Sequence, residues 1–466
     1  MADAIIKKMS DSAVARWTVL IIVATAMMMG YFVNDVMSPL ETMLEAPVSE
    51  GGMGWTSSDY GFFSGAGGLI NVYLLMLFFS GIILDKMGVR FTGVLATSLM
   101  VLGVVVKLYA LTSNLGVDAF HLSFGSYQVD MPQSVAIASL GFAIFGVGYE
   151  MTGITVSKAM VRWFTGHELA LAMGIQLAMA RLGTAAALSI SAPIARHFSL
   201  STPLLVSLAF LIIGLLSFLV FCVMDRRLDM QSAELEKISA KTKMEGVKSS
   251  NSQDDSEEFR FSDIGVTLRS PGFWLITLFC VLFYSAVSPF LKFATKLLVV
   301  KYGVDADIAG FVTSIAPFGT IVLTPLFGVL YDRHGHGVSF IIAGAAMLAC
   351  VHLGFALPFH SGAIAVLLMV VLSIGYSLAP SALWPCVPKI IPLKCLGTAY
   401  SMIFFIQNFG RSIIPMVVGK TNGIDPSYTT SMIVFALTAI GAMLAAIAML
   451  YVDKRKGYGL QRPNMH

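Results

Sequence analysis

The sequence predicts an all-α membrane protein whose twelve transmembrane helices form two six-helix bundles. Of the 466 residues, 56% are hydrophobic and only 12% are charged, whereas a soluble globular protein has roughly 25% charged residues. Twelve apolar segments follow one another along the chain, each long enough for a spanning helix of about 20 residues. A polar stretch separates the first six segments from the last six, and a short loop sequence occurs once in each half.

The apolar segments give the bounds of the expected helices. They are 16–42, 58–84, 91–113, 133–158, 168–194 and 202–224, followed by 272–298, 307–331, 338–357, 362–386, 396–420 and 429–452. The stretch between them is rich in Lys, Glu, Asp and Ser, which is typical of a solvated linker. We therefore expect an N-terminal bundle (1–224), a cytosolic linker (225–271) and a C-terminal bundle with a short cytosolic tail (272–466).

Lysine and arginine predict the orientation of the helices. Loops 43–57 and 114–132 contain neither residue, whereas the termini, the linker and the loops on the opposite side carry many. Because positive residues concentrate on the cytosolic side, we expect both termini and the linker in the cytosol. The net charge of +3 gives no indication of a nucleic-acid partner. No catalytic or metal-binding motif occurs, so we expect neither an enzyme nor a cofactor.

A short sequence is repeated in the two halves. GIILDKMGVR (81–90) follows the second expected helix, and GVLYDRHGHG (328–337) follows the eighth. Both read Gly-x-x-x-Asp-[Lys/Arg]-x-Gly. One copy is compatible with an ordinary tight turn, but two copies at matching places indicate an internal repeat.

These loops resemble the loop signature of the major facilitator superfamily. The resemblance rests on Gly81, Asp85, Gly88 and Arg90 in the first copy and Gly328, Asp332, Arg333 and Gly335 in the second. It implies two six-helix bundles that rock around a central cavity. It also implies a gating role for the loops. We expect Asp85 near the start of the eleventh helix and Asp332 near the start of the fifth, with the first glycine of each copy allowing close helix approach.

Charged residues inside the expected helices are candidates for a transport site, because an ionisable side chain at membrane depth is costly. Glu150 lies in the fourth helix and Arg181 near the middle of the fifth. A structural pair that joins these two helices is the alternative to a binding role. Arg411 lies in the eleventh helix, the repeat mate of the fifth, so we expect it to face Arg181 across the cavity. The alternative for Arg411 is snorkelling or the capping of a carbonyl.

Polar and aromatic residues on three C-terminal helices are expected to line the same cavity. Tyr284 lies in the seventh helix, Tyr376 and Trp384 in the tenth, and Gln407 and Asn408 in the eleventh. The tenth helix also contains a proline between its two aromatic residues, which frees a backbone carbonyl. Plain packing of the aromatic side chains is the alternative.

Charges near the outer helix ends are expected to serve gating or anchoring. Asp35 in the first helix and Lys292 in the seventh lie at matching places of the repeat. We expect them to pair when the outer side is closed, the alternative being that each faces water. Four further lysines are expected to snorkel toward the membrane interface: Lys107, Lys296, Lys301 and Lys420.

Several stretches are similar to one branch of the superfamily, the lysosomal dipeptide carriers and their bacterial relatives. They are GVGYE (146–150), RWFTGHELALAMGIQLAMARLG (162–183), FYSAVSPF (283–290), YSLAPSALWP (376–385) and LGTAYSMIFFIQNFG (396–410). By resemblance, the family's acidic residue falls on Glu150, its arginine on Arg181 and its tryptophan on Trp384. The resemblance implies a uniporter that moves dipeptide zwitterions by facilitated diffusion. Arg411 departs from the pattern, which leaves the substrate range open.

The alternative function is an organic-anion carrier in which Arg181 and Arg411 hold a carboxylate. A receptor on a transporter scaffold is a third hypothesis. The chain contains no Asn-x-Ser/Thr sequence and lacks the acidic dileucine signal expected of a lysosomal member. We therefore expect a bacterial inner membrane, with a lysosomal membrane as the alternative. The expected partners are a small-molecule substrate and the lipid bilayer, with no obligate protein partner.

Overall fold

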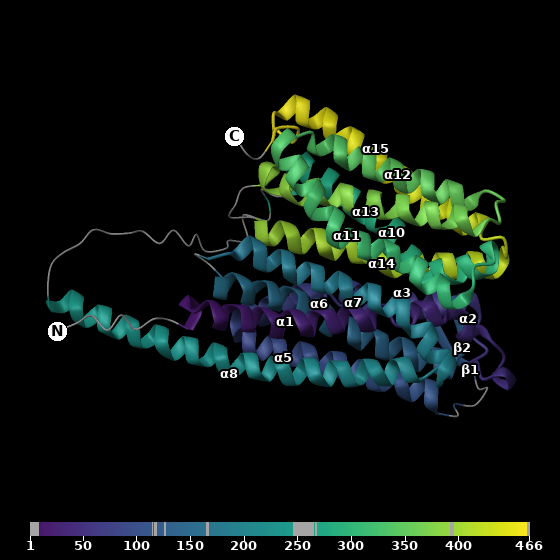
Figure 1. Cartoon of the computed structure of the whole chain (residues 1–466), viewed down its shortest axis with the longest axis horizontal. Helices are drawn as coiled ribbons and strands as arrows, with labels where there is room; N and C mark the ends of the chain where they lie inside the picture. The colour runs from purple at the N-terminus through teal and green to yellow at the C-terminus, as the bar shows by residue number, and fades with distance from the viewer. Residues whose placement is uncertain are drawn as a thin grey trace.

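The computed structural model describes residues 9–113, 115, 119–124, 127–164, 167–245, 265, 268–391 and 396–463. The chain forms two groups of helices that lie side by side, the N-terminal half in purple to teal and the C-terminal half in green to yellow (Figure 1). Within the described residues, eleven helices are long and apolar enough to cross a membrane. This arrangement confirms the predicted all-α membrane fold.

The N-terminal half runs from η1 to α8. Its helices are η1 (Met9–Asp11), α1 (Ala13–Asp35), η2 (Ser38–Leu40), α2 (Glu41–Glu45), η3 (Val48–Glu50), α3 (Ser57–Ala66), α4 (Leu69–Tyr73), α5 (Met76–Thr112), α6 (Gln133–Phe164), α7 (Leu169–His197) and α8 (Thr202–Glu245). Between α5 and α6, strands β1 (Ala119–Phe124) and β2 (Tyr127–Pro132) form an antiparallel hairpin with Ala119 opposite Pro132. This hairpin was not predicted from the sequence.

The C-terminal half contains six long helices. They are α10 (Pro271–Tyr302), α11 (Ala306–His334), α12 (Gly337–Ala356), α13 (Gly362–Ile390), α14 (Leu396–Ile424) and α15 (Thr429–Lys456). Local signals set the ends of α10. The Ser270 hydroxyl caps the amide of Phe273, Pro271 fills the first turn, and Gly303 ends the helix at φ 60°. The helices therefore begin and end close to the predicted bounds.

The second predicted segment, 58–84, is not one helix. It is divided among α3, α4 and the start of α5, with breaks at Gly67–Gly68 and at Leu74–Leu75. At the first break the backbone of α6 comes so close that a side-chain carbon on Gly146 would lie 1.9 Å from the carbonyl oxygen of Gly67. The amide of Asn71 donates to the carbonyl of Gly146 at 3.0 Å. The break thus packs against α6 one turn before Glu150.

The last glycine of the repeated pattern adopts, in each loop, a backbone conformation that favours glycine. Gly88 interrupts α5 at φ 78° and Gly335 ends α11 at φ 73°. Both values lie in the left-handed region that glycine adopts without steric cost. These two turns define the signature end of the molecule.

The first part of the predicted linker (225–271) is helical. The α8 helix continues past residue 224 to Glu245, and its Asp225 and Asp229 carboxylates form ion pairs with Arg90 and Arg162. The first part of the stretch is therefore a helix that binds the N-terminal half. The acidic core of the predicted linker (249–258) lies outside the described residues.

Contacts between the two halves gather at the hairpin end, where α2, β1 and β2 lie (Figure 1). A side-chain carbon on Gly61 of α3 would lie 2.7 Å from the Cα of Gly419 on α14, and one on Gly310 of α11 would lie 2.3 Å from the Leu188 carbonyl on α7. Arg196 of α7 also pairs with Asp307 of α11. These contacts hold the halves together at the end opposite the signature loops.

The predicted orientation places the hairpin end outside the cell and residue 250 inside. With an impermeant thiol reagent and a background free of native cysteines, we expect labelling of Phe120→Cys in intact cells. Labelling of Ser250→Cys is expected only after permeabilisation. The reverse pattern would show that the topology is inverted.

Candidate functional site

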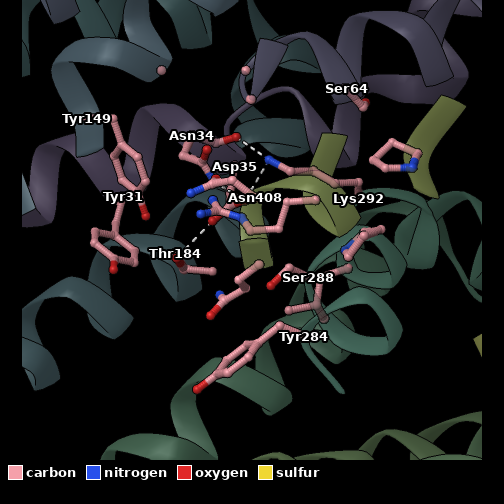
Figure 2. A pocket seen from close by; sticks show the side chains of 18 of the residues that line it. Tyr31, Asn34, Asp35, Ser64, Tyr149, Thr184, Tyr284, Ser288, Lys292 and Asn408 are labelled. Carbon is pink, nitrogen blue, oxygen red and sulfur yellow. Dashed lines mark hydrogen bonds and ion pairs between the residues drawn. The ribbon is translucent and has the colours of Figure 1, made fainter. Parts of the chain in front are cut away.

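A cavity lies between the two halves and is the candidate transport site. It encloses about 930 Å³ of empty space, including solvent at its mouth. Seven of the eight residues predicted for substrate binding line it: Glu150, Arg181, Tyr284, Tyr376, Gln407, Asn408 and Arg411. Figure 2 shows that side chains from both halves point into this space.

Glu150 pairs with Arg411 across the cavity. A guanidinium nitrogen of Arg411 on α14 lies 2.8 Å from Oε1 of Glu150 on α6. The two side chains are 24% and 19% exposed, so the pair is reached from the cavity. The structural alternative of a Glu150–Arg181 pair is therefore not what the structure shows. The pair joins the two halves, whereas a pair with Arg181 would have stayed within one half.

Arg181 instead contacts the opposite wall through Tyr376. Its guanidinium donates to the Tyr376 hydroxyl at 2.6 Å and lies 5.0 Å from the centre of that ring. No carboxylate of the described residues pairs with Arg181. Part of its charge-assisted hydrogen-bonding capacity is therefore available to a ligand.

Gln407 offers a second free polar atom in the cavity wall. Its Oε1 is buried and has no hydrogen-bond partner among the described residues. Asn408 is more constrained, since its amide donates to the Phe404 carbonyl at 3.0 Å. Gln407 therefore has an acceptor available to a ligand.

Trp384 does not line the cavity. Its ring packs against Tyr284 at 6.3 Å and against Phe404 at 5.3 Å between ring centres. Because Tyr284 itself lines the cavity, Trp384 supports that wall from behind. Direct contact of Trp384 with the substrate stays a prediction.

The predicted gate pair is present and belongs to the same cavity. Lys292 Nζ lies 2.8 Å from Asp35 Oδ1 and also donates to the Asn34 carbonyl. The other Asp35 oxygen accepts from the Thr184 hydroxyl at 2.8 Å. Both bonds are drawn in Figure 2. Asp35 is thus fully engaged between α7 and α10.

Three of the four lysines expected to snorkel are buried instead. Lys107 is completely buried, with its ammonium 4.8 Å from the centre of the Phe142 ring. Lys301 donates to the Phe355 carbonyl at 2.7 Å. Lys296 binds a group of acidic residues described below. Only Lys420 is exposed, as predicted.

Lys296 joins the halves at the hairpin end. Its ammonium lies 3.2 Å from Glu41, 2.5 Å from Glu45 and 2.9 Å from the Ser57 hydroxyl. Glu41 is completely buried. The sequence analysis did not identify Glu41 or Glu45 as partners of Lys296, because it expects the lysines at outer helix ends to snorkel toward the membrane interface.

Asp85 and the first glycine of each signature loop do not make the contacts expected of them. Asp85 pairs with Lys158 of α6 at 2.6 Å and is 77% exposed, so it is not packed against the start of α14. Side-chain carbons on Gly81 or Gly328 would meet nothing within 4 Å. Asp332 and Arg333 lie in the last turn of α11, and Arg333 is exposed. Within the described residues, Asp85 therefore does not join the two halves at the signature end.

Two tyrosines of the cavity were missed in the sequence. The Tyr31 and Tyr149 rings lie 5.0 Å apart, and the Arg411 guanidinium lies 5.9 Å from the centre of the Tyr149 ring. Tyr149 directly precedes Glu150, so its place beside the charge could have been inferred. Among the described residues, no group of three or more His, Cys, Asp or Glu side chains could hold a metal ion.

Comparison with known proteins identifies the family. Residues 20–415 match the family model described as Major Facilitator Superfamily. The chain belongs to the major facilitator superfamily. It is thus an integral membrane transporter with a small-molecule substrate, and the predicted resemblance is confirmed.

The major facilitator relatives agree in fold. The lysosomal dipeptide transporter MFSD1 of Homo sapiens is 27% identical over 394 residues, which cover 82% of this chain and 76% of that protein. The crystal structure of peptide transporter POT in complex with sulfate has a TM-score of 0.65 at 13% identity, over 96% of each chain. A D-xylose-proton symporter has a TM-score of 0.65 at 14% identity, over 93% of this chain and 97% of its own.

Proposed function

We propose that the protein carries dipeptides across the membrane by alternating access, as a uniporter. One observation carries the proposal: the cavity is lined by a carboxylate, Glu150, and by two guanidinium groups, Arg181 from the same half and Arg411 from the other. A dipeptide zwitterion has one ammonium and one carboxylate, and burying them is costly unless both are paired. The name of the MFSD1 relatives, dipeptide transporters, supports the same substrate class.

The charged groups in the cavity match the two ends of a dipeptide in kind. Its ammonium and carboxylate are separated by about 5–6 Å of backbone. Glu150 accepts from the ammonium, and Arg181 holds the carboxylate with two parallel hydrogen bonds. Oε1 of Gln407 accepts from the peptide N–H. The small substrate thereby satisfies polar atoms that the described residues leave free.

In the proposed cycle, the substrate replaces an internal partner. Arg411 neutralises Glu150 while the site is empty, and the arriving ammonium takes its place. Because a protein cation rather than a proton compensates the carboxylate, no proton has to move with the peptide. The exchange also breaks the Glu150–Arg411 ion pair between the two halves, which favours their rocking when substrate is bound.

The proposed conformation is inward-facing. Contacts between the halves lie at the hairpin end, while Asp85 at the signature end is exposed. With the topology predicted from Lys and Arg, the hairpin end is extracellular and the cavity is accessible from the cytosol. We place the carrier in a bacterial inner membrane, as expected from the absence of glycosylation sequences.

The organic-anion carrier is retained as a second candidate because of the charges in the cavity. Arg181, Arg411 and Lys292 line it, against the carboxylates of Glu150 and Asp35. This excess of one positive charge would suit a carboxylate without an ammonium. Glu150 distinguishes the two functions, because only an ammonium requires a free carboxylate in the site.

A binding screen separates the two candidates. Purified protein is heated with Ala-Ala, N-acetyl-Ala-Ala, alanine and succinate, and the unfolding temperature is recorded. We expect the unfolding temperature to rise clearly with Ala-Ala only, because acetylation removes the ammonium that Glu150 binds. Equal stabilisation by the acetylated and free peptides, or stabilisation by succinate alone, would favour the anion carrier.

A further inference from the structure

Lys107 is a buried cation without an acceptor, next to the central cavity. It lies on α5 and its side chain is completely buried. No described atom accepts a hydrogen bond from its Nζ. Aromatic contacts with Phe142 and Phe145, at 4.8 and 5.0 Å, compensate part of its charge. They do not supply the hydrogen bonds that a buried ammonium requires.

The ammonium of Lys107 faces a second, narrow pocket. The pocket has no room for a water-sized molecule in this conformation, and it shares Asn34, Ser64, Phe142 and Lys292 with the central cavity. Two further hydroxyls in its wall, those of Ser38 and Ser64, adjoin the Tyr60 hydroxyl but make no hydrogen bond of full geometry among the described residues. Three buried polar groups, all of them able to donate, therefore meet in one place.

The charges around the two pockets are unbalanced. Lys292 lies 5.5 Å from the centre of the same Phe142 ring, so its nitrogen and that of Lys107 are no more than about 10 Å apart. Asp35 neutralises Lys292. Lys107 adds a fourth basic side chain to Arg181, Arg411 and Lys292, against the carboxylates of Glu150 and Asp35. A zwitterion leaves this excess of basic groups unchanged, whereas a ligand with one extra negative charge reduces it.

We propose that Lys107, with the hydroxyls of Ser38 and Ser64, forms a subsite for the carboxylate side chain of an acidic dipeptide. The inference rests on the proposed function and names the substrates within it that bind best. The ends of the peptide occupy the Glu150 and Arg181 positions, and its Asp or Glu side chain reaches toward Lys107. A lysine suits this role because its long flexible stem moves the charge to meet the ligand.

The subsite belongs to the N-terminal half and opens during the cycle. Of the residues that line the second pocket, Lys292 comes from the C-terminal half. The pocket is too narrow for a separate molecule in this conformation. When the halves part at the hairpin end, Lys292 leaves with α10 and the pocket joins the cavity. Capture of the acidic side chain then accompanies the outward-open state.

The test compares two dipeptides of equal shape. Competition of Ala-Glu and Ala-Gln against labelled Ala-Ala uptake gives the ratio of their affinities. We expect wild type to prefer Ala-Glu by roughly tenfold or more, the range of a hydrogen bond to a charged group. In Lys107→Met the ratio is expected to fall to about one, while Ala-Ala uptake continues. The matched control is Lys420→Met, an exposed lysine whose loss should leave the ratio unchanged.

The outcomes separate this inference from the proposed function. Absence of Ala-Ala uptake in wild type contradicts the proposed function itself. Ala-Ala uptake with equal affinity for Ala-Glu and Ala-Gln in wild type overturns the subsite alone, whether or not Lys107→Met folds. A preference for Ala-Glu that survives in an active Lys107→Met also overturns it. One further result would overturn the subsite: chloride inhibits uptake by wild type but not by Lys107→Met, and the ratio of the affinities for Ala-Glu and Ala-Gln is the same in both. The site would then bind free anions.

Discussion

Replacing Glu150 by glutamine is expected to abolish dipeptide uptake. The amide has nearly the same shape but no charge, so the substrate ammonium and the Arg411 guanidinium both lose their buried partner. Breaking a buried pair in this way costs about 3–5 kcal/mol, which corresponds to a loss of more than about 100-fold. The same loss is expected for Arg181→Lys, because lysine cannot make two parallel bonds to a carboxylate. Uptake of labelled Ala-Ala into cells or vesicles measures the effect.

A control variant separates this loss from general damage. Glu234→Gln removes an exposed carboxylate of α8 that is not among the residues lining the cavity, and it should transport like wild type. All variants should reach the membrane in similar amounts. Near-normal uptake by Glu150→Gln would show that the carboxylate does not bind the ammonium.

Replacing Lys296 by methionine is expected to open the hairpin end. The ammonium binds Glu41 and Glu45 of the N-terminal half, and the variant leaves these carboxylates without a cation. A loss of about 3–5 kcal/mol is expected for a broken buried pair, so the closed arrangement loses stability relative to the outward-open one. A cysteine at Ser38, which is 1% exposed, reports the change. An impermeant thiol reagent added outside should label it in the variant and not in the parent.

Lys301→Met provides the matched control for this experiment. Lys301 is buried on the same helix, but its partner is the Phe355 carbonyl within the C-terminal half. Its loss should lower thermal stability without exposing the cysteine at Ser38. Equal labelling in the Lys296→Met and Lys301→Met backgrounds would show that Lys296 does not hold the two halves together.

The fold follows from the sequence because the bilayer limits the alternatives. Apolar segments of about 20 residues in water-free surroundings must be helical, and eleven of the twelve predicted segments are matched by a spanning helix. The prediction of a single helix over the second segment, 58–84, was wrong because hydropathy does not indicate breaks in the backbone of a helix. The glycines of GAGGL (65–69) were the available signal, since adjacent glycines weaken a helix.

The kinds of residue in the site could be predicted, but their partners could not. The cost of a buried charge identifies Glu150, Arg181 and Arg411 from the sequence alone. Which cation meets Glu150 depends on how the two halves approach, and the partner on α14 lies 261 residues away. The buried lysines were assigned to the interface for a related reason. Depth along a helix says nothing about whether a side chain faces lipid or another helix.

Transport by the purified protein in liposomes tests the central claim most directly. Vesicles are loaded with unlabelled Ala-Ala, and entry of labelled Ala-Ala is followed without any proton gradient. A dipeptide uniporter predicts rapid exchange that vesicles lacking the protein and the Glu150→Gln variant do not show, and no accumulation above equilibrium when the vesicles start empty. Vesicles that exchange succinate but not Ala-Ala would contradict the dipeptide assignment and establish the anion carrier in its place.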